Sequence, residues 1–271
     1  MEKTAFAKLA KMKMLAGVTK KTMHRWSVTQ TLPFSEQLRA GVRYFDLRLG
    51  FRGKTSVSLD SEKKYHDALH FVHGLYGLQI QTGLTEILQF LEGHPKEVVV
   101  LHFQHFYNFQ PNIHEHCVTL VSRLFREKLC PVMKHASDLT LKQMWRNKWQ
   151  VIVLYRHKVL PDLMWNARMV VSPWGNVSSS SDLVKFLGSA KNRHDHKFYV
   201  SQAVLTPDSS MIAKHVTSSL KDRCAKKASK DVNKWLQSLT PGSHGLNIFM
   251  VDFIEMGDFV ANVLRLNSCD E

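Results

Sequence analysis

Short apolar runs alternate with amphipathic stretches along most of the chain. The runs have the length and the β-branched and aromatic content of strands, which predicts strands at Val42–Leu49, His70–His73, Val98–Phe103, Val151–Tyr155, Phe198–Leu205 and Leu246–Phe253. The stretches between them repeat apolar residues with a helical period, which predicts helices at Leu84–Leu91, Ile113–Leu129, Leu183–Ser189, Met211–Leu239 and Phe259–Leu266. This alternation predicts an α/β fold with parallel strands and crossover helices, whose natural closed form is a distorted TIM-type (β/α) barrel.

The first 25 residues have a different character from the rest. Lysines such as Lys8 and Lys11 are interleaved there with apolar residues such as Phe6 and Leu9, which predicts a basic amphipathic helix. Such a helix would lie on a membrane, act as a targeting segment or pack on the outside of the barrel, and the sequence leaves these alternatives open. No linker divides the remainder, so we expect an N-terminal helix over residues 1–25 and one barrel domain over residues 26–271.

Charged and titratable side chains occur at the ends of two predicted strands. Asp46 and Arg48 are two residues apart, so on a strand both point to the same side, and His73 ends the next apolar run. A guanidinium binds phosphate as a permanently charged fork, and a histidine can supply a proton near neutral pH. Phosphate-ester chemistry is therefore the first hypothesis, although an Asp-x-Arg pair at a strand end is more often a salt bridge or a loop anchor.

The amino-acid composition says more about the class of binding partner than about the reaction. The net charge of +14 favours anionic partners, and no nucleic-acid-binding motif is present, so an anionic membrane or lipid headgroup fits better than nucleic acid; simple solubility is the alternative explanation. The four cysteines show neither metal-ligand spacing nor a secreted disulfide pattern, and no apolar run is long enough to span a bilayer. We expect a cytoplasmic monomer that can contact membranes peripherally.

Several segments together resemble a known family. Gly41-Val42-Arg43-Tyr44-Phe45-Asp46-Leu47-Arg48 and His73-Gly74 are similar to the X-region signature of phosphatidylinositol-specific phospholipases C, in particular the small X domain-containing proteins. The likeness continues through Trp26–Gln30, His105–Tyr107, Ser172–Trp174, Val200–Gln202 and Asp252–Phe259, and it extends from about Lys20 to Asn267. The resemblance implies the distorted barrel of these enzymes and acid-base cleavage of a phosphoinositide-like lipid.

The resemblance also implies roles for single residues. His73 matches the histidine that protonates the leaving alcohol, and Arg48 matches the arginine that replaces a metal ion in the bacterial-type enzymes, with Asp46 as the acid beside it. Asp252 matches the late acid that orients the first catalytic histidine. Arg156, Gln202 and Trp174 are weaker candidates for binding the substrate, and neither a metal nor another cofactor is expected.

One part of the family pattern does not occur in this sequence. Relatives carry their first catalytic histidine in a Pro-Gly-Ser-His-Asp-Ser segment at the end of the first barrel strand, upstream of the stretch that matches Trp26–Gln30, so we expect that strand to be missing. His244 follows a Pro-Gly-Ser sequence, but it precedes the last predicted strand and is a poor substitute. His102 stands where relatives usually have aspartate. We therefore expect a phospholipase C-type phosphodiesterase with impaired activity, or alternatively a catalytically silent phosphoinositide- or membrane-binding module.

Overall fold

The computed structural model describes residues 20–53, 62–157, 163–189, 196–240 and 246–267. The described residues form two compact units. Unit 2 comprises those within Pro33–Val171 and His194–Phe198, and unit 1 comprises those within Met1–Leu32, Ser172–Arg193 and Tyr199–Glu271. Most of the predicted N-terminal helix, residues 1–19, lies outside the described residues; the described helix α2 spans Lys20–Ser27.

Unit 2 is built on a six-stranded sheet with the strand order β3-β2-β1-β4-β5-β6. Its strands are β1 (Tyr44–Phe51), β2 (Leu69–His73), β3 (Leu75–Gln79), β4 (Val99–Tyr107), β5 (Val151–Tyr155) and β6 (Trp165–Asn166). Strands β1, β4, β5 and β6 pair in parallel, whereas β2 is antiparallel to β1 and β3 is antiparallel to β2. A short strand β7 (Val170–Val171) follows β6 along the chain.

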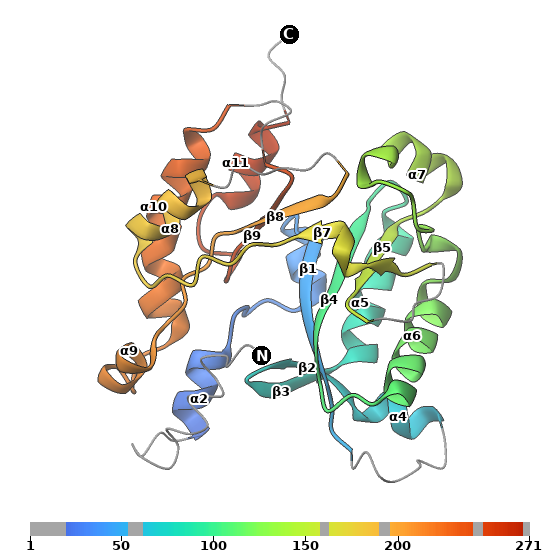
Figure 1. The fold of residues 1–271 in the computed structure, drawn as a ribbon, viewed down its shortest axis with the longest axis horizontal. Coiled ribbons are helices and arrows are strands. Elements are labelled where there is room, and N and C mark those ends of the chain that lie inside the picture. The colour runs from blue at the N-terminus through green and yellow to red at the C-terminus, as the bar shows by residue number, and fades with distance from the viewer. Residues whose placement is uncertain (1–19, 54–61, 158–162, 190–195, 241–245, 268–271) are drawn as a thin grey trace. The chain divides into compact units, whose positions relative to one another are not determined.

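Helices cover one face of this sheet, as Figure 1 shows for α5 and α6. The helical segments of unit 2 are α3 (Phe34–Arg39), α4 (Glu62–Ala68), α5 (Ile80–Gly93), α6 (Pro111–Phe125), η1 (Arg126–Lys128), η2 (Ala136–Asp138), α7 (Leu141–Asn147) and η3 (Ala167–Met169). Alternate residues of β1, namely Phe45, Leu47 and Leu49, are buried in the same apolar cluster as Leu84 and Val121 of these helices. This cluster is the main core of unit 2, and it leaves the other alternate residues of β1 for the opposite face.

The antiparallel hairpin of β2 and β3 corrects the expectation that the strands are all parallel. Gly74 connects the two strands with a φ of 72°, a left-handed conformation that favours glycine and allows a tight turn. Gly50 of β1 must also be small, because a Cβ atom there would lie 2.5 Å from Val72 Cγ2 and 2.8 Å from Tyr76 Cε1. Close approach between β1 and the hairpin therefore depends on this glycine.

Unit 1 contains a parallel pair of strands and several helices. The strands are β8 (Phe198–Gln202) and β9 (Ile248–Met250), and the helices are α2, α8 (Ser180–Ser189), α9 (Ser209–Lys214), α10 (Lys226–Gln237) and α11 (Phe259–Arg265). A five-residue π-helix, η4 (Lys221–Ala225), leads directly into α10, so the single predicted helix Met211–Leu239 is in fact divided. Trp26, Leu183 and Leu236 are completely buried in the core of this unit.

The predicted α/β class is confirmed, and the described strands form open sheets without a closed ring of strands among them. No helix within the described ranges is both long and apolar enough to cross a membrane. Cys117, Cys130 and Cys224 are buried and free, while Cys269 lies outside the described residues.

Candidate active site

Asp46 and Arg48 lie side by side on the face of β1 opposite the main core of unit 2. The Arg48 Nε atom is 3.8 Å from Asp46 Oδ1, and the side chains are 28% and 13% exposed, respectively. Burial raises the pKa of Asp46, while the positive charge of Arg48 opposes this shift. The prediction that both residues point to one side is confirmed, and the pair combines a partly exposed cation with a carboxyl group that is poorly solvated.

A second polar pair lies next to them. His102 on β4 is opposite Asp46 in the parallel ladder, and its Nδ1 atom is 2.8 Å from the hydroxyl oxygen of Tyr44. Burial, followed by the positive charges of Arg156 and His105, lowers the pKa of His102 to about 4. Burial, followed by the charge of Asp46, raises the pKa of Tyr44. Both groups are therefore uncharged near neutral pH.

Two more basic side chains extend this face toward the carboxyl ends of the strands. His105 lies opposite Arg48 in the ladder, after a register shift that follows Leu47. Arg156 directly follows β5; its backbone N–H donates to the carbonyl oxygen of Phe103 at 3.1 Å, and its side chain is exposed. Arg48, His105 and Arg156 thus come from three neighbouring strands, an arrangement that suits an anion.

His73 is the last residue of β2, as the sequence predicted. Strand β2 runs antiparallel to β1, with Phe71 opposite Leu49. The pairing of β2 with β1 ends at Phe71, and beyond it His73 pairs with Leu75 inside the hairpin. Asp46 and Arg48 lie inside β1, which continues to Phe51, and not at the end of the strand as the sequence predicted.

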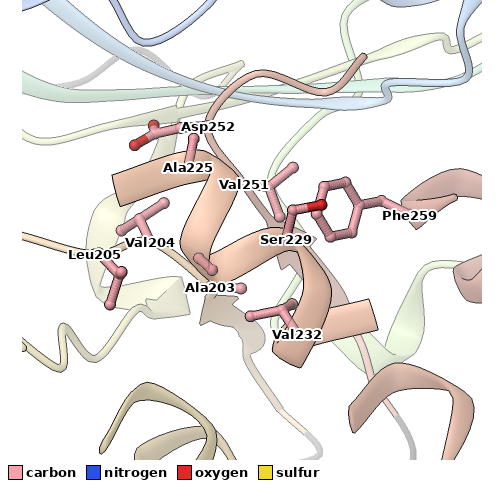
Figure 2. Close-up of a pocket in the computed structure, with 10 residues that line it drawn as sticks. Ala203, Val204, Leu205, Ala225, Ser229, Val232, Val251, Asp252 and Phe259 are labelled. Carbon is pink, nitrogen blue, oxygen red and sulfur yellow. The ribbon is translucent and has the colours of Figure 1, made fainter. Parts of the chain in front are cut away.

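Asp252 belongs to unit 1, where it follows β9. It lies at a small hollow of about 250 Å³, open solvent included, whose lining is mostly apolar: Ala203, Val204, Leu205, Ala225, Ala228, Ser229, Val232, Val251, Asp252 and Phe259. In Figure 2 the Asp252 carboxylate lies at the margin of this group, and its oxygens point away from Phe259. Burial, followed by the negative charge of Asp252, raises the pKa of the neighbouring Cys224 thiol to about 12, so this thiol is not a nucleophile near neutral pH.

Gln202 and Trp174, the other candidates in unit 1, are both engaged in local hydrogen bonds. Gln202 is buried, and its amide nitrogen donates to the hydroxyl and the carbonyl oxygen of Ser172, at 2.8 and 3.1 Å. Trp174 is 40% exposed, and its indole N–H donates to Thr206 Oγ1 at 2.9 Å. These bonds hold both side chains in place, and Trp174 remains partly exposed.

Sequence reasoning did not anticipate the pairing of Tyr44 with His102. Tyr44 belongs to the signature segment. Its contact with His102 depends on the register between β1 and β4, which cannot be read from the sequence. Among the described residues no cluster of three or more histidine, cysteine or acidic side chains has the arrangement of a metal site.

The chain is similar to curated proteins over nearly its whole length. It is 37% identical over 254 residues to the mouse PI-PLC X domain-containing protein 3, with 92% of this chain and 76% of that protein covered. It is 36% identical to the mouse PI-PLC X domain-containing protein 2 over 93% of this chain and 72% of that protein. The human PI-PLC X domain-containing protein 1 is 33% identical over 94% of this chain and 76% of that protein. No family model matches the sequence.

Solved structures share the fold at much lower sequence identity. A variant of the phosphatidylinositol-specific phospholipase C from Staphylococcus aureus is 13% identical with a TM-score of 0.67, over 93% of this chain and 88% of that one. The phosphatidylinositol-specific phospholipase C from Listeria monocytogenes is 17% identical with a TM-score of 0.64, over 94% of this chain and 89% of that one. The fold is therefore that of the bacterial phosphatidylinositol-specific phospholipases C, which is of the TIM-barrel type.

Proposed function

Because this chain belongs to the family of PI-PLC X domain-containing proteins, we propose that it binds a phosphoric diester of the phosphatidylinositol type and cleaves it. The observation that carries the proposal is the Asp46 and Arg48 pair on the face of β1 opposite the main core of unit 2. A guanidinium that is always charged stabilises the negative charge that develops on phosphate oxygens during the reaction. The carboxyl group of Asp46 orients that guanidinium.

The proposed reaction uses one further group of the same unit. A hydroxyl of the headgroup attacks phosphorus and loses its proton to a water molecule, the bond from phosphorus to the lipid alcohol oxygen breaks, and His73 gives a proton to that oxygen. Arg48 binds the phosphate in this scheme without a metal ion. Arg156, at the end of the neighbouring strand β5, would bind a further oxygen of the headgroup.

Asp252 is proposed to support the acid-base chemistry, the role that the family resemblance gives it, although this sequence does not match the segment that carries its histidine partner in relatives. Gln202 and Trp174 are proposed to contact the headgroup, Trp174 through its exposed ring. Asp252→Asn is expected to lower turnover and to leave the affinity for inositol 1-phosphate unchanged. Equal losses in both would give Asp252 a binding role.

A binding module without turnover is the second candidate. It is favoured by His102, the histidine that faces Asp46 in the ladder, because a pKa of about 4 makes it a weak general base near neutral pH. In that case Arg48 and Arg156 would hold a phosphorylated headgroup that is not cleaved.

Two measurements on the same variants separate the candidates. Arg48→Ala should weaken the binding of inositol 1-phosphate in calorimetry by roughly 10²-fold, the scale for one charge-assisted group in a preorganised site. Arg52→Ala is the matched control, because Arg52 is exposed and directly follows β1. Release of cyclic inositol phosphate from phosphatidylinositol vesicles supports the enzyme, and binding without release supports the module. Equal affinities of the Arg48 and Arg52 variants would refute the proposed site.

Peripheral contact with an anionic membrane is the second part of the proposal. Helix α10 buries Ala228, Val232 and Leu236, while its exposed side carries four lysines, Lys226, Lys227, Lys230 and Lys234. Each lysine close to an anionic leaflet contributes about 1 kcal/mol. The free cysteines support a reducing compartment such as the cytoplasm.

A further inference from the structure

His102 carries a polar atom that the proposed reaction leaves unexplained. The residue is 2% exposed, and its Nε2 atom is buried with no hydrogen-bond partner among the described residues. A buried polar group without a partner destabilises a fold, so natural proteins keep few of them unless they serve a purpose. His102 is opposite Asp46 in the ladder, so the residue lies on the face of the sheet that carries the candidate site.

The bond to Tyr44 determines which ring nitrogen of His102 carries the proton. If the Tyr44 hydroxyl donates to Nδ1, the hydroxyl is satisfied and the proton of the neutral ring is on Nε2. If Nδ1 donates instead, the Tyr44 hydrogen has no acceptor among the described residues, and Nε2 is unpaired as well. The first arrangement leaves fewer unsatisfied groups, and it makes Nε2 a hydrogen-bond donor that points away from Tyr44.

The surroundings of this donor favour an anionic acceptor. The charged and titratable groups on the three strands around the ring are Tyr44, Asp46 and Arg48 of β1, His105 of β4, and Arg156 after β5. Burial keeps the His102 ring neutral, and the positive charges of Arg156 and His105 add to this effect. A neutral imidazole donates a hydrogen bond without giving up a proton, which suits a phosphate oxygen that must remain charged.

We propose that His102 is a ligand-binding residue whose neutral Nε2–H group donates a hydrogen bond to a phosphate oxygen of the ligand, and that Tyr44 is the positioning residue that fixes this tautomer. The inference rests on the proposed function, because it takes the phosphate of that ligand to be bound by Arg48. It adds a second contact from the neighbouring strand, so that one phosphate is held by a charged group and a neutral group.

The tautomer is measured first, on the full chain without ligand. Long-range ¹H–¹⁵N NMR of histidine-labelled protein should show His102 as the neutral Nε2–H form from about pH 5.5 to about pH 8, since its pKa of about 4 lies below this range. Tyr44→Phe should shift the signals toward a mixture of tautomers. An Nδ1–H tautomer or a charged ring in the wild-type chain overturns the inference.

Two substitutions then separate the two ring nitrogens. Asparagine at this position keeps an acceptor near the place of Nδ1 and removes the distal donor, whereas glutamine keeps a donor near the place of Nε2. His102→Asn should weaken the binding of inositol 1-phosphate and of inorganic phosphate about tenfold in calorimetry, and His102→Gln should bind more tightly than His102→Asn. Adding inositol 1-phosphate to the wild type should move the Nε2 proton signal downfield.

The outcomes distinguish this inference from the proposed function. Wild-type binding that His102→Asn leaves unchanged overturns this inference alone. A loss seen with myo-inositol but not with inorganic phosphate also overturns it, because the donor would then serve a hydroxyl group. A wild-type chain that binds neither phosphate compound overturns the proposed function and this inference together.

Discussion

Replacing His102 should change how the stability of the protein depends on pH. The pKa of His102 is lowered from 6.5 to about 4, mainly by burial, so between these values the unfolded chain binds a proton that the folded chain does not. The stabilisation linked to neutral His102 is therefore complete above about pH 6.5 and is lost as the pH falls toward 4. Over the whole range this amounts to about 3 kcal/mol, of which about 2 kcal/mol falls between pH 7 and pH 5.

The assay is urea unfolding of the wild type and His102→Asn at several pH values between about 7 and 5. The wild type should lose about 2 kcal/mol more unfolding free energy than the variant over this range. His114, whose pKa is also lowered to about 4, is present in both proteins and cancels in the comparison. His24→Asn, at an exposed position of α2, controls for the loss of a histidine as such.

The two proteins are compared by the slope of unfolding free energy against pH. A general destabilisation by asparagine is the same at every pH and therefore does not change that slope. Parallel pH profiles for the wild type and His102→Asn would contradict this prediction, because they would mean that His102 titrates alike in the folded and unfolded chains. That result would also contradict the statement that the His102 ring is neutral in the folded chain, next to Arg156, His105 and Tyr44.

Three further predictions test other parts of the molecule. Chelation of divalent cations should leave any phosphodiesterase activity unchanged, because Arg48 supplies the positive charge at the phosphate; recovery of lost activity by added calcium would contradict this. Gly50→Ala should destabilise unit 2 by about 1–3 kcal/mol in urea unfolding, because its Cβ would lie 2.5 Å from Val72 Cγ2, whereas Gly93→Ala meets nothing within 4 Å and should be harmless. Reversing the charges of three exposed lysines of α10, Lys227, Lys230 and Lys234, should weaken co-sedimentation with phosphatidylserine vesicles much more than the same reversal at Lys134, Lys142 and Arg146; equal losses would show that only net charge matters.

Hydrophobic pattern predicted the strands best where burial is complete. Strand β5 has the predicted bounds Val151–Tyr155, because every residue in it is buried and a continuous apolar run leaves little ambiguity. Strand β3 was missed, since Leu75–Gln79 contains a glycine and is mostly exposed, so it has no apolar pattern. The antiparallel direction of β2 follows from its pairing and from the turn at Gly74, which periodicity alone does not specify.

Some features of the candidate site could also be predicted from the sequence, whereas others could not. Spacing by two residues was enough to predict that Asp46 and Arg48 share a face, because alternation along a strand is local. The bond between Tyr44 and His102 joins residues 58 positions apart, and it depends on the register of β1 against β4. Nothing in the sequence sets that register by itself, since it results from how the buried residues of both strands pack under the helices.

The central claim is that the phosphate of a phosphatidylinositol-type ligand binds at Arg48. The most direct test is a crystal structure of the full chain with inositol 1-phosphate. We expect phosphate oxygens about 2.7–2.9 Å from the guanidinium nitrogens of Arg48, with one of these oxygens also within hydrogen-bond distance of His102 Nε2. A phosphate bound elsewhere, with Arg48 still turned toward Asp46, would contradict it.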